Sequence, residues 1–144
     1  MNDLIKELYQ EIILDHGQTP RNFGECENHN KSAKGHNPLC GDTVKVTLVV
    51  DENNFIKDIK FSGEGCAISI ASASLMTERL KNKSLNEANM IFDDFTNLIK
   101  GQTDNLKVIT EDDSLYALKG VTAFPMRVKC ATMSWHAYHS AVND

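Results

Sequence analysis

Two adjacent segments that alternate between apolar and polar residues constrain the fold of this chain more than any other feature. Residues 42–50, DTVKVTLVV, and residues 55–63, FIKDIKFSG, carry apolar side chains at nearly every second position, which is typical of half-buried strands. Only the polar residues 51–54, DENN, separate them, so we predict an antiparallel hairpin. A third strand is expected from residues 26–36, where the alternation is weaker.

The rest of the chain is dominated by helical patterns. Apolar residues repeat at three- and four-residue intervals, and Ser84 with Glu87 matches the capping box that opens a helix. Gly17 and Gly120 are expected to stop the first and fourth helices, and the polar residues 102–113 are expected to form a solvated connection. The predicted helices cover residues 4–16, 67–81, 84–101, 114–120 and the segment from Pro125 onward.

Helices that follow a small antiparallel sheet define an α+β fold, and a length of 144 residues fits a single domain spanning 1–144. The net charge of −5, without a basic cluster, argues against nucleic-acid binding. Charges interrupt the apolar N-terminal stretch, so we expect neither a secretory leader nor a membrane span, and a cytoplasmic location. Cytoplasmic thiols stay reduced, so the four cysteines favour metal binding or sulfur chemistry over disulfides.

Three cysteines occupy predicted element ends. Cys40 lies in a loop before a strand, Cys66 directly precedes a helix, whose N-terminus favours a thiolate, and Cys130 lies early in the last helix. Their separations of 26 and 64 residues do not match paired zinc-finger spacing. Spacing alone therefore leaves two alternatives open, a shared site or three unrelated buried cysteines. Cys26 lies apart from these motifs and is interpreted as a bystander.

The three cysteine motifs, in order, resemble those of the IscU/NifU-like family of iron–sulfur cluster assembly proteins. The similarity extends to the N-terminal segment and so covers nearly the whole chain. It implies a three-stranded antiparallel sheet packed against helices, with the cysteines gathered at one end. The segments that carry the resemblance are NPLCGD, GEGCAISIASASLMT, FPMRVKCATMSW and LYQEIILDH followed by PRNFG.

This resemblance implies a metal site formed by Cys40, Asp42, Cys66 and Cys130. Three thiolates and one carboxylate suit tetrahedral Zn²⁺, although the formal charge is equally compatible with a [2Fe-2S] cluster. Gly41 would let the chain turn so that the residues on either side of it both face the metal.

Two features separate this chain from scaffold members that resemble IscU. Those members carry a histidine immediately before the third cysteine, where this chain has Lys129, and their segment before that cysteine is shorter. The extra residues near 100–120 resemble the SufU branch, which is associated with bound zinc and with a SufS-type cysteine desulfurase. The resemblance therefore implies a zinc-dependent sulfurtransferase that serves downstream iron–sulfur assembly proteins. A non-enzymatic cluster scaffold and a purely structural zinc domain remain the alternatives.

Cys40 is the expected catalytic residue, because it lies on a loop and is the most mobile of the three thiols. By resemblance, a desulfurase group replaces Cys40 on the metal, and the freed thiolate attacks the outer sulfur of the enzyme's persulfide. Arg127 lies about one helical turn before Cys130 and either neutralises the site or is an ordinary surface arginine. Lys129 either faces solvent or contacts the metal ligands without binding the metal itself.

Overall fold

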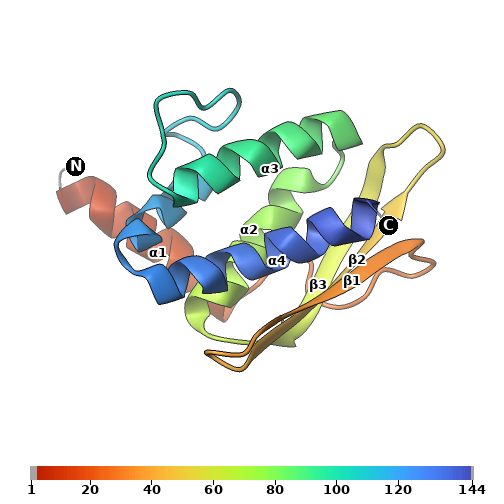
Figure 1. The fold of residues 1–144 in the computed structure, drawn as a ribbon, viewed down its shortest axis with the longest axis horizontal. Helices are drawn as coiled ribbons and strands as arrows, with labels where there is room; N and C mark the ends of the chain where they lie inside the picture. Colours follow the sequence, from red (N-terminus) through yellow and green to blue (C-terminus); the bar gives the residue numbers. More distant parts are fainter. Residues whose placement is uncertain (1–2, 144) are drawn as a thin grey trace.

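The computed structural model describes residues 3–143 and contains one antiparallel sheet with strand order β1–β2–β3 (Figure 1). The strands are β1 (Lys31–Asn37), β2 (Asp42–Val50) and β3 (Ile56–Glu64). The predicted hairpin and the predicted three-stranded sheet are both confirmed. The third strand is real but begins at Lys31, because residues 26–30 form a turn and connection rather than part of the ladder.

The register of the sheet collects its apolar residues on one face. Val46 pairs with Phe61 and Leu48 pairs with Ile59, and all four side chains are buried. Because side chains alternate across a strand, this register turns a continuous apolar surface toward the helices.

Four α-helices and one 3₁₀-helix complete the described chain, and none of these helices is long and apolar enough to cross a membrane. The Ser84–Glu87 capping box is present with both reciprocal hydrogen bonds. Two predicted helix ends are wrong: Gly17 lies inside the first helix, packed against Ala67, and Gly120 lies inside the 3₁₀-helix. The helices are α1 (Asp3–Gln18), α2 (Ala67–Leu80), α3 (Leu85–Ile99), η1 (Ser114–Ala123) and α4 (Pro125–Asn143).

Helices α2 and α4 lie against the sheet, and α3 lies on their outer side (Figure 1). The Trp135 ring on α4 stacks on the Phe95 ring of α3 with centroids 4.2 Å apart, and both side chains are buried. The residues of α2, most of them small, are buried along most of its length. Helix packing therefore positions the start of α2, which Cys66 caps, and the second turn of α4, which carries Cys130.

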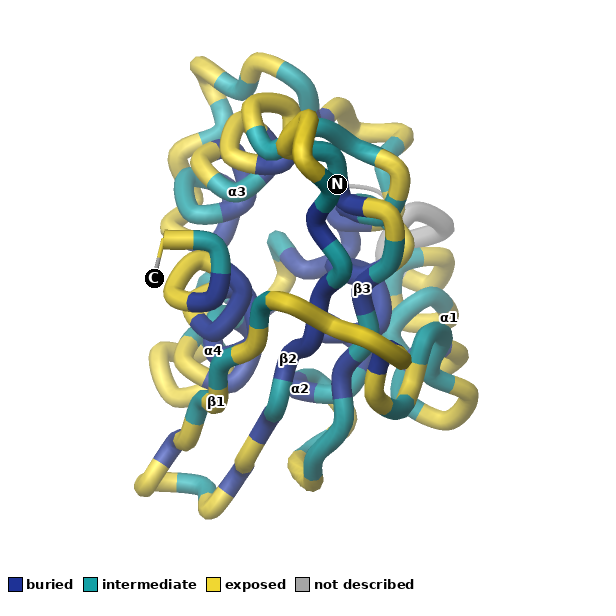
Figure 2. Tube along the Cα trace, turned by 90° about the vertical axis from the view of Figure 1, so that its right-hand side faces the viewer, coloured by how far each residue is buried: buried dark blue, intermediate teal, exposed yellow. Residues whose placement is uncertain are grey.

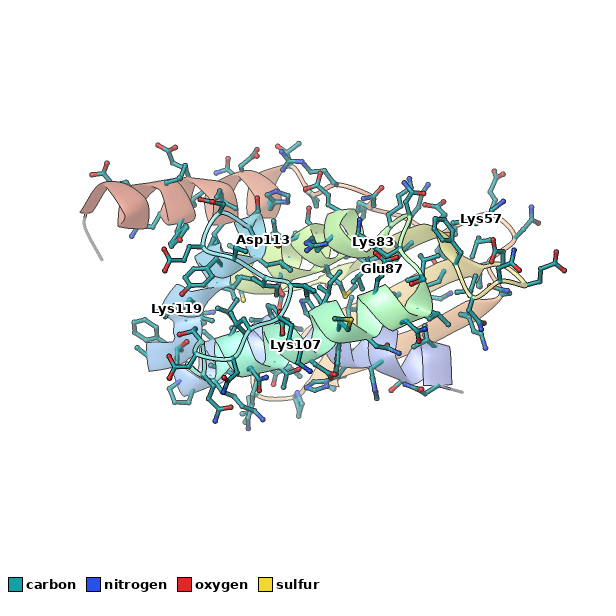
Figure 3. All side chains as sticks on the ribbon, turned by 90° about the horizontal axis from the view of Figure 1, so that it is seen from above. Lys57, Lys83, Glu87, Lys107, Asp113 and Lys119 are labelled. Atoms are coloured by element: carbon teal, nitrogen blue, oxygen red, sulfur yellow. The ribbon has the colours of Figure 1, made fainter. Side chains whose placement is uncertain are left out.

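Residues 102–113 differ from the expected solvated connection. The buried carboxylate of Asp94 accepts hydrogen bonds from the backbone N–H groups of Lys107, Val108 and Ile109 at 2.6–3.0 Å, and Ile109 enters the core. At the end of the segment, Asp113 caps η1 and accepts a hydrogen bond from Arg79 at 2.9 Å. Figure 3 labels Lys107 and Asp113, which lie along this segment. The polar composition of residues 102–113 gave no sign of these contacts, because the buried acceptor, Asp94, lies on α3.

The Asp94 contact predicts a specific loss of stability. In Asp94→Asn, one carboxylate oxygen becomes an NH₂ group that faces backbone donors, so the free energy of unfolding should fall by about 1–3 kcal/mol. Denaturant unfolding measures this loss, and hydrogen exchange should show the amides of residues 107–109 losing protection. The exposed neighbour Asp93, changed to Asn, is the matched control and should leave both measurements unchanged. Equal effects of the two variants would contradict this account.

Candidate metal centre

Three segments far apart in sequence meet at one end of the sheet. They are the β1–β2 turn, the start of α2 and the first turns of α4 (Figure 1). In Figure 2 the β1–β2 turn is the hairpin end that projects at the lower left, where exposed and buried residues alternate. This meeting point brings together the cysteine motifs that are separated by up to 90 residues.

Three of the predicted ligands lie within metal-binding distance of one another. The ligand atoms of Cys40, Asp42 and Cys130 all fall within 4.8 Å of one another, and the sulfurs of Cys40 and Cys130 are 3.4 Å apart. Asp42 and Cys130 are buried, whereas Cys40 is half-buried. Of these three candidate ligands, two therefore lie in the interior and one lies near the surface.

Cys66 occupies the N-cap of α2, as predicted, and is half-buried. Its sulfur is not within 4.8 Å of all three other ligand atoms, so it stands at the margin of the cluster. It lies 3.9 Å from the Ser69 hydroxyl, which in turn contacts Asp42. Cys66 would be the third thiol and the fourth ligand of the predicted set, and it is the predicted ligand that lies outside the compact group.

Ser69 holds the Asp42 carboxylate in place. Its hydroxyl donates to Asp42 Oδ2 at 2.6 Å, and both side chains are buried. A Cβ atom at Gly65 would lie 3.0 Å from the Asp42 carboxyl carbon, so a glycine at that position lets the chain pass close by. The buried charge thus has a strong hydrogen bond before any metal is considered.

Asn37 organises the β1–β2 turn and was missed in the sequence analysis. Its backbone carbonyl accepts from the N–H groups of Cys40 and Gly41, and its side-chain carbonyl accepts from Leu39 N–H at 3.2 Å. Its amide nitrogen lies 3.6 Å from the sulfur of Cys40 and 3.8 Å from that of Cys130. The available signal was the Asn-Pro pair, which favours turn initiation.

Gly41 has the backbone conformation that the sequence analysis required of it. Its φ of +72° lies in the left-handed region, which glycine adopts without steric cost, and nothing lies near a Cβ built there. The turn at Gly41 places the side chains of Cys40 and Asp42 on the same side of the chain, and their ligand atoms lie within 4.8 Å of each other.

Burial and the neighbouring thiols both make the Cys130 thiol harder to ionise. Burial raises the pKa of the Cys130 thiol to about 12, and hydrogen bonds with Cys40 and Cys66 add to this rise. Electrostatic interaction with Cys66, and to a smaller extent with Cys130, raises the pKa of the exposed Arg127 guanidinium. Arg127 therefore lies beside the thiols, as one of its two predicted roles required. Lys129 is exposed, which matches its solvent-facing alternative.

The donor set fits a tetrahedral metal ion. Two thiolates bound to one Zn²⁺ at about 2.3 Å lie roughly 3.8 Å apart at a tetrahedral angle, close to the observed separation of Cys40 and Cys130. The cationic Arg127 lies nearby, and Asp42 is already oriented by Ser69. Supporting contacts of this kind are typical of protein metal sites.

Cys26 lies away from this cluster. Its side chain is buried against β2, where its sulfur lies 3.4 Å from the Thr47 carbonyl, and burial raises the pKa of its thiol. A buried thiol with a raised pKa is unreactive, which supports its interpretation as a bystander.

Comparison with known proteins assigns the class. Residues 8–131 match the family model of the NifU-like N-terminal domain, so the chain belongs to this iron–sulfur cluster assembly family. It is 38% identical over 141 residues to the zinc-dependent sulfurtransferase SufU of Bacillus subtilis, covering 98% of this chain and 93% of that protein. It is also 36% identical to the iron–sulfur cluster assembly scaffold protein IscU of Streptococcus pyogenes, covering 96% and 84%.

Solved structures give the same assignment. The crystal structure of SufU from Fervidobacterium islandicum, described as an iron–sulfur cluster assembly scaffold protein for the SUF system, superposes with a TM-score of 0.84 at 32% identity, covering 94% of this chain and 97% of that one. A NifU-like N-terminal protein from Brucella abortus has a TM-score of 0.83 at 19% identity, which supports the fold alone. The resemblance to the IscU/NifU-like family and the predicted α+β fold are therefore confirmed.

The Ser69 contact yields a prediction for metal affinity. In Ser69→Ala, the Asp42 carboxylate loses the hydrogen bond that orients it, so Zn²⁺ affinity should fall by about 10–100-fold. Competition with a chromophoric chelator measures the affinity. Ser32→Ala, on the exposed side of β1, is the control and should bind as the wild type does. Unchanged affinity in Ser69→Ala would show that Asp42 needs no support or is not a ligand.

Proposed function

We propose that this protein is a zinc-dependent sulfur acceptor that takes persulfide sulfur from a cysteine desulfurase for iron–sulfur cluster assembly. The observation that carries the proposal is the unequal burial of the ligands. Cys40 is half-buried on a turn with a left-handed glycine, whereas Asp42 and Cys130 are fixed in the interior. A partly exposed thiol can contact a partner enzyme, whereas the buried ligands beside it cannot. The similarity to the zinc-dependent sulfurtransferase SufU supports this choice.

Zinc would be held by Cys40, Asp42, Cys66 and Cys130, and it would keep their sulfurs deprotonated near neutral pH. The protein's own residues perform the remaining tasks. Asn37 holds the turn that carries Cys40, Ser69 orients Asp42, and Arg127 offsets the negative charge of the thiolates.

The proposed transfer is a thiol–disulfide type of exchange in which no external oxidant takes part. The Cys40 thiolate attacks the outer sulfur of the desulfurase persulfide, and a new S–S bond forms on Cys40 as the S–S bond of the donor breaks. The desulfurase cysteine leaves as a thiolate, so electrons and sulfur atoms balance. Because a thiolate held on zinc would be a weaker nucleophile than a free one, Cys40 would have to be free of the metal in order to attack.

The site's surroundings favour a protein partner. Leu39, Phe124 and Met126 are large apolar residues that are more than half exposed. Leu39 precedes Cys40 in the β1–β2 turn, Phe124 directly precedes α4, and Met126 lies in the first turn of α4 beside Arg127. Exposed apolar residues gathered around a reactive group are typical of an interaction surface. We propose that a SufS-type cysteine desulfurase docks here, and that later assembly proteins receive the sulfur.

A cluster scaffold is the second candidate function. The same thiols could hold a [2Fe-2S] cluster, and the similarity to the IscU scaffold of Streptococcus pyogenes favours this possibility. Lys129 argues against it, because a protonated amine has no lone pair with which to replace a histidine ligand. The two functions predict different metals in the purified protein.

Metal analysis distinguishes the candidates. Protein purified anaerobically without added metal should contain about one zinc per chain and little iron, because three thiolates and a carboxylate suit zinc. Elemental analysis and a sulfide assay provide the measurement. Stoichiometric iron with acid-labile sulfide would favour the scaffold instead.

The transfer step is tested at Cys40. Mixed with a SufS-type desulfurase and cysteine, the wild type should raise turnover and acquire a persulfide that peptide mass spectrometry locates on Cys40. Cys40→Ser should fold normally and lose both effects, because its hydroxyl is not a nucleophile for sulfur at neutral pH. The control is Cys26→Ser, which removes the buried bystander and should retain both. Sulfur on Cys26 or Cys130, or full stimulation by Cys40→Ser, would contradict the mechanism.

A further inference from the structure

The two edges of the sheet are treated differently by the fold. The outer edge of β3 is closed by residues 22–24, because Gly24 N–H donates to the Phe61 carbonyl and Phe61 N–H donates to the Asn22 carbonyl. β1 is the terminal strand at the other edge, and among the described residues no strand pairs with its outer side. An open strand edge presents backbone donors and acceptors that can pair with another chain.

A groove of about 400 Å³ runs between this open edge and α4. β1 and the turn after it line one wall through Lys34 to Leu39, and α4 lines the other through residues 129–140 at three- and four-residue intervals. Three turns of helix give the groove a length of about 16 Å, which matches about five residues of extended chain. Its shape therefore suits an extended polypeptide better than a compact small molecule.

The groove is cationic although the chain as a whole is acidic. Lys34 and Lys129 contribute two exposed positive charges, His36 and His136 contribute exposed imidazoles, and none of the described residues that line it is acidic. The net charge of the whole chain is −5, so this distribution is a local concentration of positive charge. Neither lysine forms an ion pair within the described part of the chain.

Charge also decides between two kinds of occupant. A second copy of this chain that paired through its own β1 would bring Lys34 of one copy close to Lys34 of the other. Like charges placed across a strand pair are destabilising, so self-pairing is disfavoured. An acidic segment of a different protein would instead be attracted to the positive charge of Lys34.

We infer that the groove between β1 and α4 binds an extended acidic segment of a partner protein, which adds to the sheet as a fourth strand beside β1. Backbone hydrogen bonds from β1 supply binding, while Lys34 and Lys129 select acidic side chains. Pro38 and Leu39 line the groove and immediately precede Cys40. A segment bound there lies next to the turn that carries the half-buried thiol, so this surface adjoins the metal centre. Binding at the groove does not depend on sulfur transfer.

The test uses a short capped peptide that alternates glutamate with valine, and NMR of the full chain. Its addition should shift the amide signals of residues 32–39 and of the facing part of α4. Lys34→Glu/Lys129→Glu should weaken binding by about tenfold or more, because each reversal opposes the peptide's charge. The control Lys57→Glu/Lys107→Glu changes two exposed lysines outside the groove, both labelled in Figure 3, and should bind as the wild type does.

Two further peptides separate strand addition from simple charge attraction. A version with methylated backbone nitrogens at alternate residues cannot complete the ladder and should lose binding, and a lysine–valine version should not bind. Circular dichroism shows whether the reversed variant is folded, and the single variant Lys129→Gln gives a milder test if it is not. Equal binding of the methylated peptide, shifts elsewhere on the protein, no shifts at all, or dimerisation of the chain through β1 would each overturn the inference.

Discussion

The geometry of the metal centre depends on the close crossing of α2 and α4. Ser72 on α2 is fully buried, its hydroxyl donates to the Ala131 carbonyl at 2.5 Å, and it accepts from Trp135 Nε1 at 3.1 Å. Trp135 in turn stacks on Phe95 of α3. Ser72 is six residues after Cys66, and Ala131 follows Cys130. One polar contact inside an apolar core therefore joins α2, which Cys66 caps, to α4, which carries Cys130.

The site combines rigid and movable parts. Asp42 and Cys130 are buried and held by Ser69 and by the α4 packing, whereas Cys40 lies on a turn and Cys66 at a helix end. A purely structural zinc site would gain from burying all four ligands, since exposure of a ligand invites exchange. The exposure of Cys40 is more consistent with a group that leaves and returns. The proposed function therefore rests on the unequal burial of chemically similar side chains.

Two surfaces of different chemistry lie next to the β1–β2 turn. On one side lie Arg127 and the exposed Phe124, and on the other lies the cationic groove beside β1, which Leu39 helps to line. Both surfaces adjoin the loop that bears Cys40, so a partner on either one would reach the same thiol. The open edge of β1 contrasts with the closed edge of β3, and this asymmetry places the available backbone at the functional end of the protein.

The sequence by itself determined the strands, most helix boundaries and the cysteine motifs, because alternation, capping residues and glycine turns are local properties of the chain. It did not determine that residues 102–113 are anchored, since their acceptor, Asp94, lies on α3. Nor did it show that Asn37 contacts two thiols, that Ser69 holds Asp42, or that Cys66 stands at the margin of the cluster. These facts were decided by tertiary structure alone, because each depends on a contact between segments whose separation in space is set by core packing.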